Sequence, residues 1–363
     1  MNEWQGPSPS EADRGTRRFP LDGPVLALDL GGTQIRTAAV RPDGTLLVRA
    51  ARATPAAEGA AAIVDACIAT LREACDGLDA VHRAGLVGVG ISATGPVDPG
   101  RGVIVDPPNI SPDFRDVPLA AAVERGLGLP AVLERDTHVA ALAEQAFGAG
   151  RGVDDFVYLT ISTGIGGAIV SGGELLPGRD DAAAEFGHVT LQLDGPACGC
   201  GERGHFEALA SGLAIATAGR DAVAAGRSAP LAEAARRAAP GALSARGVAE
   251  AADAGDAVAT AIMAAARDAF VASILGIVNM LNPSRIVVGG SVAHGQGDRW
   301  LQPARDAARL RAFSRDAGRR VQIVLSELGD DVGLVGAVPL LARRLRGVAP
   351  AVGARDRLAT AKA

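Results

Sequence analysis

Residues 185–207 read EFGHVTLQLDGPACGCGERGHFE, and they contain two of the four cysteines and two of the five histidines in this 363-residue chain. Cys198 and Cys200 are separated by one glycine, a spacing that does not readily close a strain-free disulfide. The neighbouring glycines allow the loop to turn both thiolates toward one metal ion. With His188 and His205 they form a closed tetrahedral ligand set, which predicts a structural zinc site. The alternative is a glycine-rich turn with two unrelated histidines.

Two carboxylates flank this cluster. Glu185 precedes His188 by three residues, and Glu207 follows His205 by two. A metal ion that folds the loop between them would aim both carboxylates at a ligand, and charged carboxylates are strong acceptors for hydroxyl groups.

The composition narrows the class of protein. The length allows two or three domains, and a net charge of −5 with 3% aromatic residues gives no indication of a nucleic-acid surface. The first twenty residues are polar, which excludes a signal peptide, and the longest uncharged apolar run, 269–281, is too short to cross a bilayer. With few cysteines, the chain is expected in a reducing cytoplasm.

Lysine is nearly absent, since Lys362 is the only one. A Walker A loop and a protein kinase both place a lysine on the phosphates, and Schiff-base enzymes also need one. If the chain handles ATP, it must use backbone amides, hydroxyls, a metal ion and arginine.

A glycine-rich hairpin follows the first predicted strand. The apolar runs 25–30 and 35–40 are separated by a tip that contains Gly31, Gly32 and Thr33. Such a tip can present successive N–H groups and a hydroxyl to an anion, and Asp29 at the strand end could hold Mg²⁺ through water. The alternative is a plain Gly-Gly hairpin.

The same pattern occurs a second time. A predicted strand over 156–161 leads into a segment with Thr163, Gly164, Gly166 and Gly167, which indicates an internal duplication with phosphates gripped between two halves. A third strand end, after 286–288, carries Gly289 and Gly290. Helices are expected over 56–78, 117–126, 139–147, 208–267 with a break near Pro240, 267–281 and 333–344.

Asp136 lies where a short predicted strand, 131–133, becomes a helix. Aspartate is a favoured N-cap and needs no chemistry to occupy such a position. If it instead serves a reaction, the helix dipole and amides should keep it ionised. Asn109, in an irregular loop, is a second polar group that could meet a ligand.

With these motifs in place, the chain resembles the ROK family of sugar kinases and sugar-responsive repressors. The resemblance runs from about Val25 to Arg344 and rests most on Gly187-His188 followed by the Cys-x-Cys segment that ends in His205-x-Glu207. It implies an α/β, actin/hexokinase-like two-domain fold with duplicated ribonuclease-H-like halves and an active-site cleft between them. The expected parts are a disordered tail over 1–23, a small domain over 24–135 plus 333–347, a large domain over 136–332 with a zinc loop over 188–205, and a flexible tail over 348–363.

The resemblance also implies roles for the residues. ATP would be the phosphoryl donor, with Mg²⁺ as cofactor, structural Zn²⁺ in the loop, and a homodimer or homotetramer as the assembly. Asp136 would be the catalytic base. The implied phosphate and adenosine residues are Asp29, Gly31, Gly32, Thr33, Thr163, Gly164, Gly166, Gly167, Gly289 and Gly290, and the implied sugar residues are Asn109, Arg135, Glu185, His188 and Glu207.

Three functions compete. An ATP-dependent hexose 6-kinase is the first, a DNA-binding repressor of the family the second, and a non-catalytic sugar-binding sensor the third. Repressors carry a helix-turn-helix domain of roughly 60–80 residues before the first glycine hairpin, whereas 24 residues precede Val25 here. Because both hairpins and Asp136 are intact, the kinase is favoured.

The chain departs from the family beside Asp136. Arg135 and His138 stand where family glucokinases have asparagines. Arginine only donates hydrogen bonds, so it changes what a sugar site can recognise unless it pairs with Glu134 and points into solvent. We therefore expect the preferred substrate to be an altered hexose, such as the amino sugars kanosamine or glucosamine, phosphorylated at the 6-hydroxyl.

Overall fold

The computed structural model describes residues 21–107, 110–238, 243–345 and 347, and within them the chain forms two compact units. Unit 1 comprises the described residues up to Val153 and those from Asp330 onward, and unit 2 runs from Asp154 to Gly329. The first boundary lies later than the position after Arg135 expected from the sequence. Helix α4 (Asp136–Phe147) packs with the C-terminal helices of unit 1, which is why it belongs there.

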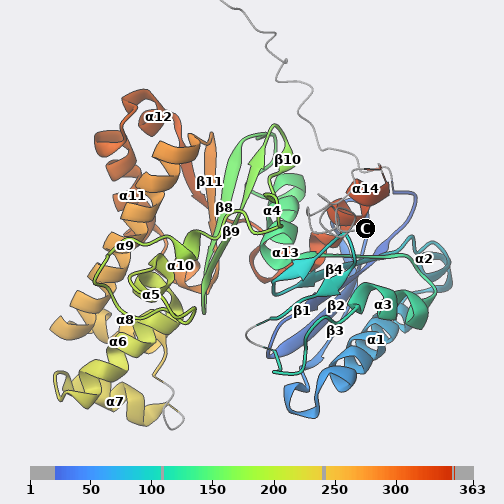
Figure 1. The fold of residues 1–363 in the computed structure, drawn as a ribbon, viewed down its shortest axis with the longest axis horizontal. Helices are drawn as coiled ribbons and strands as arrows, with labels where there is room; N and C mark the ends of the chain where they lie inside the picture. The colour runs from blue at the N-terminus through green and yellow to red at the C-terminus, as the bar shows by residue number, and fades with distance from the viewer. Residues whose placement is uncertain (1–20, 108–109, 239–242, 346, 348–363) are drawn as a thin grey trace, which may run out of the picture. The chain divides into compact units, whose positions relative to one another are not determined.

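Unit 1 is built on a five-stranded sheet (Figure 1). Its strand order is β3-β2-β1-β4-β7, with an antiparallel meander of three strands followed by two strands parallel to the first. The bounds are β1 (Val25–Leu30), β2 (Gln34–Val40), β3 (Leu46–Ala53), β4 (Val89–Ala93) and β7 (Ala131–Arg135). The short strands β5 (Val97–Asp98) and β6 (Val103–Ile104) form a separate hairpin.

Unit 2 repeats this topology. Its sheet has the order β10-β9-β8-β11-β12, again a three-stranded meander followed by two parallel strands. The bounds are β8 (Phe156–Ile161), β9 (Ile165–Ser171), β10 (Glu174–Leu175), β11 (Arg285–Gly289) and β12 (Gln322–Leu325). The internal duplication predicted from the two glycine-rich hairpins is therefore confirmed, because each hairpin opens one meander.

The helices of unit 1 cover its sheet. Helix α1 (Ala60–Asp76) packs on β1, β2 and β3 and buries Ile63 and Leu71. Helix α14 (Ala337–Leu345) packs on β1, β4 and β7. The elements are the 3₁₀ turns η2 (Ala56–Glu58) and η4 (Gly329–Asp331), with α1 (Ala60–Asp76), α2 (Ala80–Ala84), α3 (Leu119–Leu127), α4, α13 (Val332–Val335) and α14 (Ala337–Leu345). Sequence periodicity did not predict the short α2.

The helices of unit 2 surround α9 (Ala257–Leu281). This helix has the length and mean hydropathy, 1.8, of a membrane-crossing segment, yet Phe270, Ile274 and Ile277 on it belong to the core of unit 2. The others are η3 (Phe186–His188), α5 (Phe206–Ala210), α6 (Gly212–Ala224), α7 (Ala229–Arg237), α8 (Ala245–Asp253), α10 (Ser291–Gln296), α11 (Asp298–Arg311) and α12 (Arg315–Arg320). The break expected near Pro240 lies outside the described residues.

Candidate functional site

The predicted metal ligands converge in unit 2. One ligand atom from each of His188, Cys198, Cys200 and His205 lies within 4.8 Å of the others. Nδ1 of His188 is 3.8 Å from Sγ of Cys198, and Nδ1 of His205 is 3.3 Å from Sγ of Cys200. Two sulfurs and two imidazole nitrogens at this spacing fit Zn²⁺, which strongly favours such a set. The structure thus brings together the four side chains that the sequence predicts as ligands, and Zn²⁺ binding at this cluster stays a prediction.

Backbone pairing holds the loop in this shape. Thr190 pairs with His205, and Ala197 pairs with Arg203, so the two ends of the loop run alongside each other. Gly204 lies between these pairs with a φ of +67°, and a Cβ there would collide with the carbonyl of Gln192. A side chain at this position would therefore displace the last ligand.

Glu207 of α5 contacts the second glycine-rich hairpin. Its Oε2 accepts a hydrogen bond of 2.8 Å from the backbone N–H of Ile165, the first residue of β9. No local sequence pattern predicts this contact, because the two residues are far apart along the chain. Glu185, by contrast, is exposed immediately before η3. Its role in sugar binding stays a prediction.

The tip of the second hairpin is shorter than the sequence predicts, because two of its predicted glycines belong to a strand. Ser162, Thr163 and Gly164 connect β8 to β9, whereas Gly166 and Gly167 lie within β9 and pair with Thr160 and Leu159. A Cβ on Gly167 would lie 2.5 Å from the ring of Phe186, so a larger residue at this position would disturb the packing of that ring.

The third strand end joins the same hairpin. Gly290 follows β11 with a φ of +91° and precedes Ser291, the first residue of α10. The hydroxyls of Ser162 and Ser291 lie 3.1 Å apart, which neither motif predicted alone.

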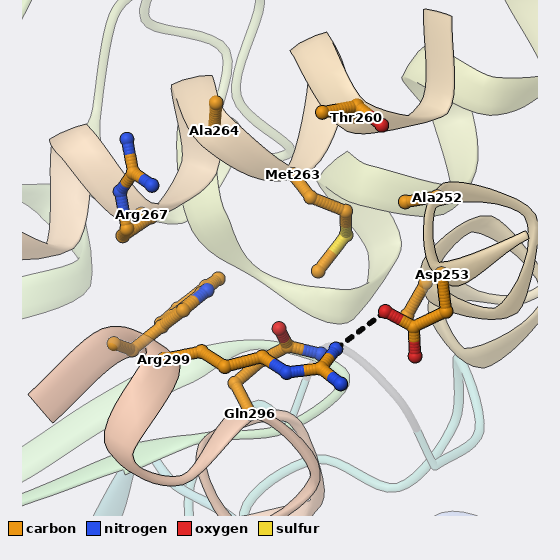
Figure 2. Close-up of a pocket in the computed structure, with 10 residues that line it drawn as sticks. Ala252, Asp253, Thr260, Met263, Ala264, Arg267, Gln296 and Arg299 are labelled. Carbon is orange, nitrogen blue, oxygen red and sulfur yellow. Dashed lines mark hydrogen bonds and ion pairs between the residues drawn. The ribbon is translucent and has the colours of Figure 1, made fainter. Parts of the chain in front are cut away.

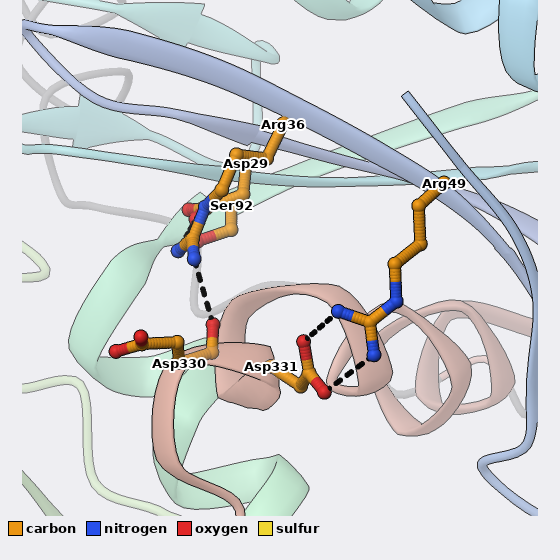
Figure 3. A network of polar contacts seen from close by, with 6 residues as sticks. All are labelled: Asp29, Arg36, Arg49, Ser92, Asp330 and Asp331. Atoms are coloured by element: carbon orange, nitrogen blue, oxygen red, sulfur yellow. Dashed lines mark hydrogen bonds and ion pairs between the residues drawn. The ribbon is translucent and has the colours of Figure 1, made fainter. Parts of the chain in front are cut away.

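In unit 1, Asp29 is paired with an arginine that the sequence reading overlooked (Figure 3). Arg36 donates to Asp29 Oδ2 from two nitrogens and to the carbonyl of Asp330 from the third, at 2.9 Å. The hydroxyl of Ser92 donates to Asp29 Oδ1 at 3.0 Å. Asp29 and Arg36 are direct partners in the β1–β2 register, so counting back from the Gly-Gly tip could have found this pair.

In the first glycine-rich tip, backbone groups of Gly31 form hydrogen bonds within the protein. The N–H of Gly31 donates to the carbonyl of Gln34 at 3.0 Å, and the hydroxyl of Thr54 donates to the carbonyl of Gly31 at 2.7 Å. Gly31 therefore shapes the turn with its amide, and Gly32 and Thr33 are the residues between it and β2.

Asp136 is the first residue of α4, and the N-cap position belongs to Arg135. The capping alternative is thus wrong, because the carboxylate accepts only the adjacent N–H of Thr137, at 2.7 Å, among the hydrogen bonds described. Burial, with a smaller contribution from the charge of Asp29, raises the pKa of the Asp136 carboxyl to about 6 against the lowering effect of that N–H bond. The sequence predicts that the helix terminus lowers the pKa of this carboxyl, and that direction is wrong, because burial outweighs the helix terminus; with a pKa of about 6 the group is still largely ionised at neutral pH.

Arg135 does not point into solvent, so that alternative is wrong as well. Its residue is 7% exposed, its side chain passes over Gly95, and Nη2 donates to Nε2 of His138 at 2.9 Å. His138 in turn lies 3.0 Å from Oε1 of Glu134 through Nδ1. Because arginine can only donate, His138 accepts at Nε2 and carries its proton on Nδ1. These three side chains form a buried chain of hydrogen bonds beside Asp136.

One predicted site residue cannot be placed, and the pocket in unit 2 is not lined by any of the others. Asn109 lies outside the described residues. A pocket of ≈ 190 Å³ in unit 2 is lined by α8, α9, α10 and α11, where Arg299 pairs with Asp253 (Figure 2). Among the described residues, none of the predicted site residues lines this pocket.

Comparison with known proteins matches this arrangement to one family. The family model described as "ROK family" matches residues 25–344. The chain is 33% identical over 323 residues to a glucokinase of Thermotoga maritima, covering 89% of this chain and 98% of that one. It is 31% identical to an N-acetylmannosamine kinase of Escherichia coli O1:K1, covering 87% and 97%.

A solved structure gives the same picture. A ROK family glucokinase from Streptomyces griseus, in complex with glucose and AMPPNP, superposes with a TM-score of 0.72 at 36% identity, covering 89% of this chain and 100% of that chain. The two-domain α/β fold of the actin/hexokinase type, expected from the resemblance, is confirmed.

Proposed function

Because this chain belongs to the ROK family, we propose that it is an ATP-dependent sugar kinase that phosphorylates a hexose or amino-hexose at the 6-hydroxyl. The observation that carries the proposal is the pair of carboxylates in unit 1. Asp29 is neutralised by Arg36, whereas Asp136 has a pKa raised to about 6. Two carboxylates whose environments differ in this way can take different roles. Asp29 can bind a positively charged group, and Asp136 can accept a proton.

In the proposed reaction Asp136 accepts the proton of the sugar 6-hydroxyl as its oxygen attacks the γ-phosphorus of ATP. The new O–P bond forms while the bond from the γ-phosphorus to the β,γ-bridging oxygen breaks, and ADP leaves. A base with a pKa near 6 is largely ionised at neutral pH and still basic enough to take the proton as it is released. Bound Mg²⁺ would neutralise charge on the phosphates.

The other proposed roles follow the two glycine hairpins and the metal loop. Gly31, Gly32 and Thr33 with the tip at Thr163 and Gly164 would bind the phosphates, and Gly289-Gly290 the adenosine. Asn109, Arg135, Glu185, His188 and Glu207 would bind the sugar. Since His188 turns Nδ1 toward the metal ligands, its Nε2 is the nitrogen proposed to meet a sugar hydroxyl. Zn²⁺ would be held by the four loop ligands and would fix the loop without taking part in the reaction.

The sugar preference is proposed to depend on Arg135. The Arg135 side chain is buried, with its aliphatic part against Gly95 and its guanidinium bonded to His138, which supports a position within the sugar site instead of at the surface. Both positions at which family glucokinases have asparagine are filled here by the larger, hydrogen-bonded pair. We therefore propose that glucose is not the best substrate and that an amino sugar such as glucosamine or kanosamine is phosphorylated more efficiently.

We expect Arg135→Asn to move the ratio of kcat/KM for glucosamine to that for glucose toward glucose by more than about threefold, or ~0.7 kcal/mol. The double variant R135N/H138N should move it further, because it places asparagine at both positions at which family glucokinases have it. Arg101→Asn makes the same chemical change at an exposed position and should leave the ratio unchanged. If glucose is the better substrate in both the natural protein and Arg135→Asn and the ratio stays within threefold, Arg135 does not select the sugar.

The kinase proposal itself is tested by ADP release in the presence of ATP, Mg²⁺ and single sugars. Release that depends on the sugar supports it, and a protein that binds sugar without releasing ADP is a sensor instead.

A further inference from the structure

We propose that Glu207 is a positioning residue for the hairpin tip Ser162–Gly164, through its hydrogen bond to Ile165, in addition to any contact with sugar. The proposal rests on the proposed function only where it concerns nucleotide binding. It joins two motifs that the sequence presents separately, the metal loop and the second glycine-rich hairpin.

The contact is short and leaves no room for a side chain on the hairpin. Glu207 Oε2 accepts from the N–H of Ile165 at 2.8 Å, and a Cβ on Gly164 would lie 2.6 Å from the same oxygen. A side chain at position 164 would therefore push this carboxylate away from the N–H of Ile165.

Glu207 is itself held from its N-terminal side by the metal loop. His205, one of the four proposed ligands, is the N-cap of α5, and the N–H of Phe206 donates to the carbonyl of Val189 at 2.9 Å. Glu207 follows in the first turn of α5 and is partly buried. The position of its carboxylate is therefore set by the loop that carries the cluster.

Further contacts of the tip come from α6. The N–H groups of Gly212 and Leu213 donate to the carbonyls of Ser162 and Thr163 at 2.8 and 3.1 Å. These bonds fix the carbonyl side of the tip, whereas Glu207 fixes the amide that begins β9. Losing Glu207 should loosen the amide side, which is the side that a phosphate would meet.

Three substitutions at position 207 separate the effect of side-chain length from the effect of side-chain charge. Glu207→Gln keeps the length and an oxygen acceptor but removes the charge, Glu207→Asp keeps the charge but shortens the side chain, and Glu207→Ala removes both. We expect the N–H of Ile165 to exchange with deuterium about tenfold faster in Asp and Ala variants, and to stay near the natural rate in Gln. Glu202→Ala, an exposed carboxylate on the same loop, should change nothing.

The nucleotide measurement is made without sugar. The dissociation constant for ADP should rise about tenfold in Glu207→Ala and Glu207→Asp and be largely restored in Glu207→Gln, whereas a residue that only binds sugar would leave it unchanged. The positioning role is overturned if exchange at Ile165 is unaffected in Ala, or if Asp protects it better than Gln. Failure of the natural protein to bind ADP would instead count against the kinase proposal, since the exchange experiment does not use nucleotide.

Discussion

Asp136→Asn is expected to lower kcat by about 10²–10⁴-fold, the range for removal of a general base, while the dissociation constants for sugar and ATP change little. Asparagine fills nearly the same volume and can still accept the N–H bond of Thr137, so α4 should be preserved. Because the lost interaction belongs to the transition state, kcat and kcat/KM should fall together. A variant that keeps more than about a tenth of the natural rate would limit Asp136 to a structural role.

The pH profile supplies the matched control. Burial holds the pKa of Asp136 at about 6, so its basic form is present above this value and is lost as pH falls through it. The natural protein should therefore show kcat decreasing on the acid side near pH 6. The residual rate of Asp136→Asn should lack this limb, since no carboxylate is left to protonate at position 136. An unchanged limb in the variant would assign it to another group.

Removal of the metal is expected to have the second largest effect. Freshly purified protein should contain one zinc per chain, and Cys200→Ser should lose it, because the closed set then has three strong ligands. Sugar affinity should fall by roughly tenfold or more, about 1.4 kcal/mol, together with thermal stability. The reason is that Glu207, a proposed sugar-binding residue, lies only two residues after the ligand His205 and should move when the metal is lost. The measurements are metal analysis, a melting curve and a sugar titration.

A second cysteine provides the comparison. Cys75 lies in α1 of unit 1, away from the cluster along the chain, and is a free thiol. Cys75→Ser should keep the zinc and the sugar affinity. Cys67 is unsuited to metal binding, because burial raises the pKa of its thiol to about 12 and keeps it protonated. Active natural protein that contains no zinc would contradict the metal assignment.

Local patterns were enough to predict the longer strands, both glycine-rich hairpins and the four side chains that converge in the metal loop. Each depends on residues close together in sequence, such as Cys198 and Cys200 around one glycine. The pairing of Asp29 with Arg36 was also within reach, because it follows from the hairpin register.

What sequence reasoning missed depends on packing between distant segments. The raised pKa of Asp136 results from burial and from Asp29 on another strand, neither of which a helix-start pattern reveals. Likewise, Glu207 meets Ile165 only because α5 packs beside the hairpin. The buried side chain of Arg135 packs over Gly95, a contact that no spacing rule predicts.

The central claim, transfer of a phosphoryl group from ATP to the 6-hydroxyl of a sugar, is tested most directly with pairs of sugars that differ only at that position. ADP release should be measured with glucose, glucosamine and kanosamine, and with 6-deoxyglucose as the matched partner of glucose. We predict ADP release well above the sugar-free rate, a product phosphorylated at carbon 6, and no stimulation by the 6-deoxy sugar. Release above the sugar-free rate that is equal with glucose and 6-deoxyglucose, or no release above the sugar-free rate with any sugar, would contradict the account.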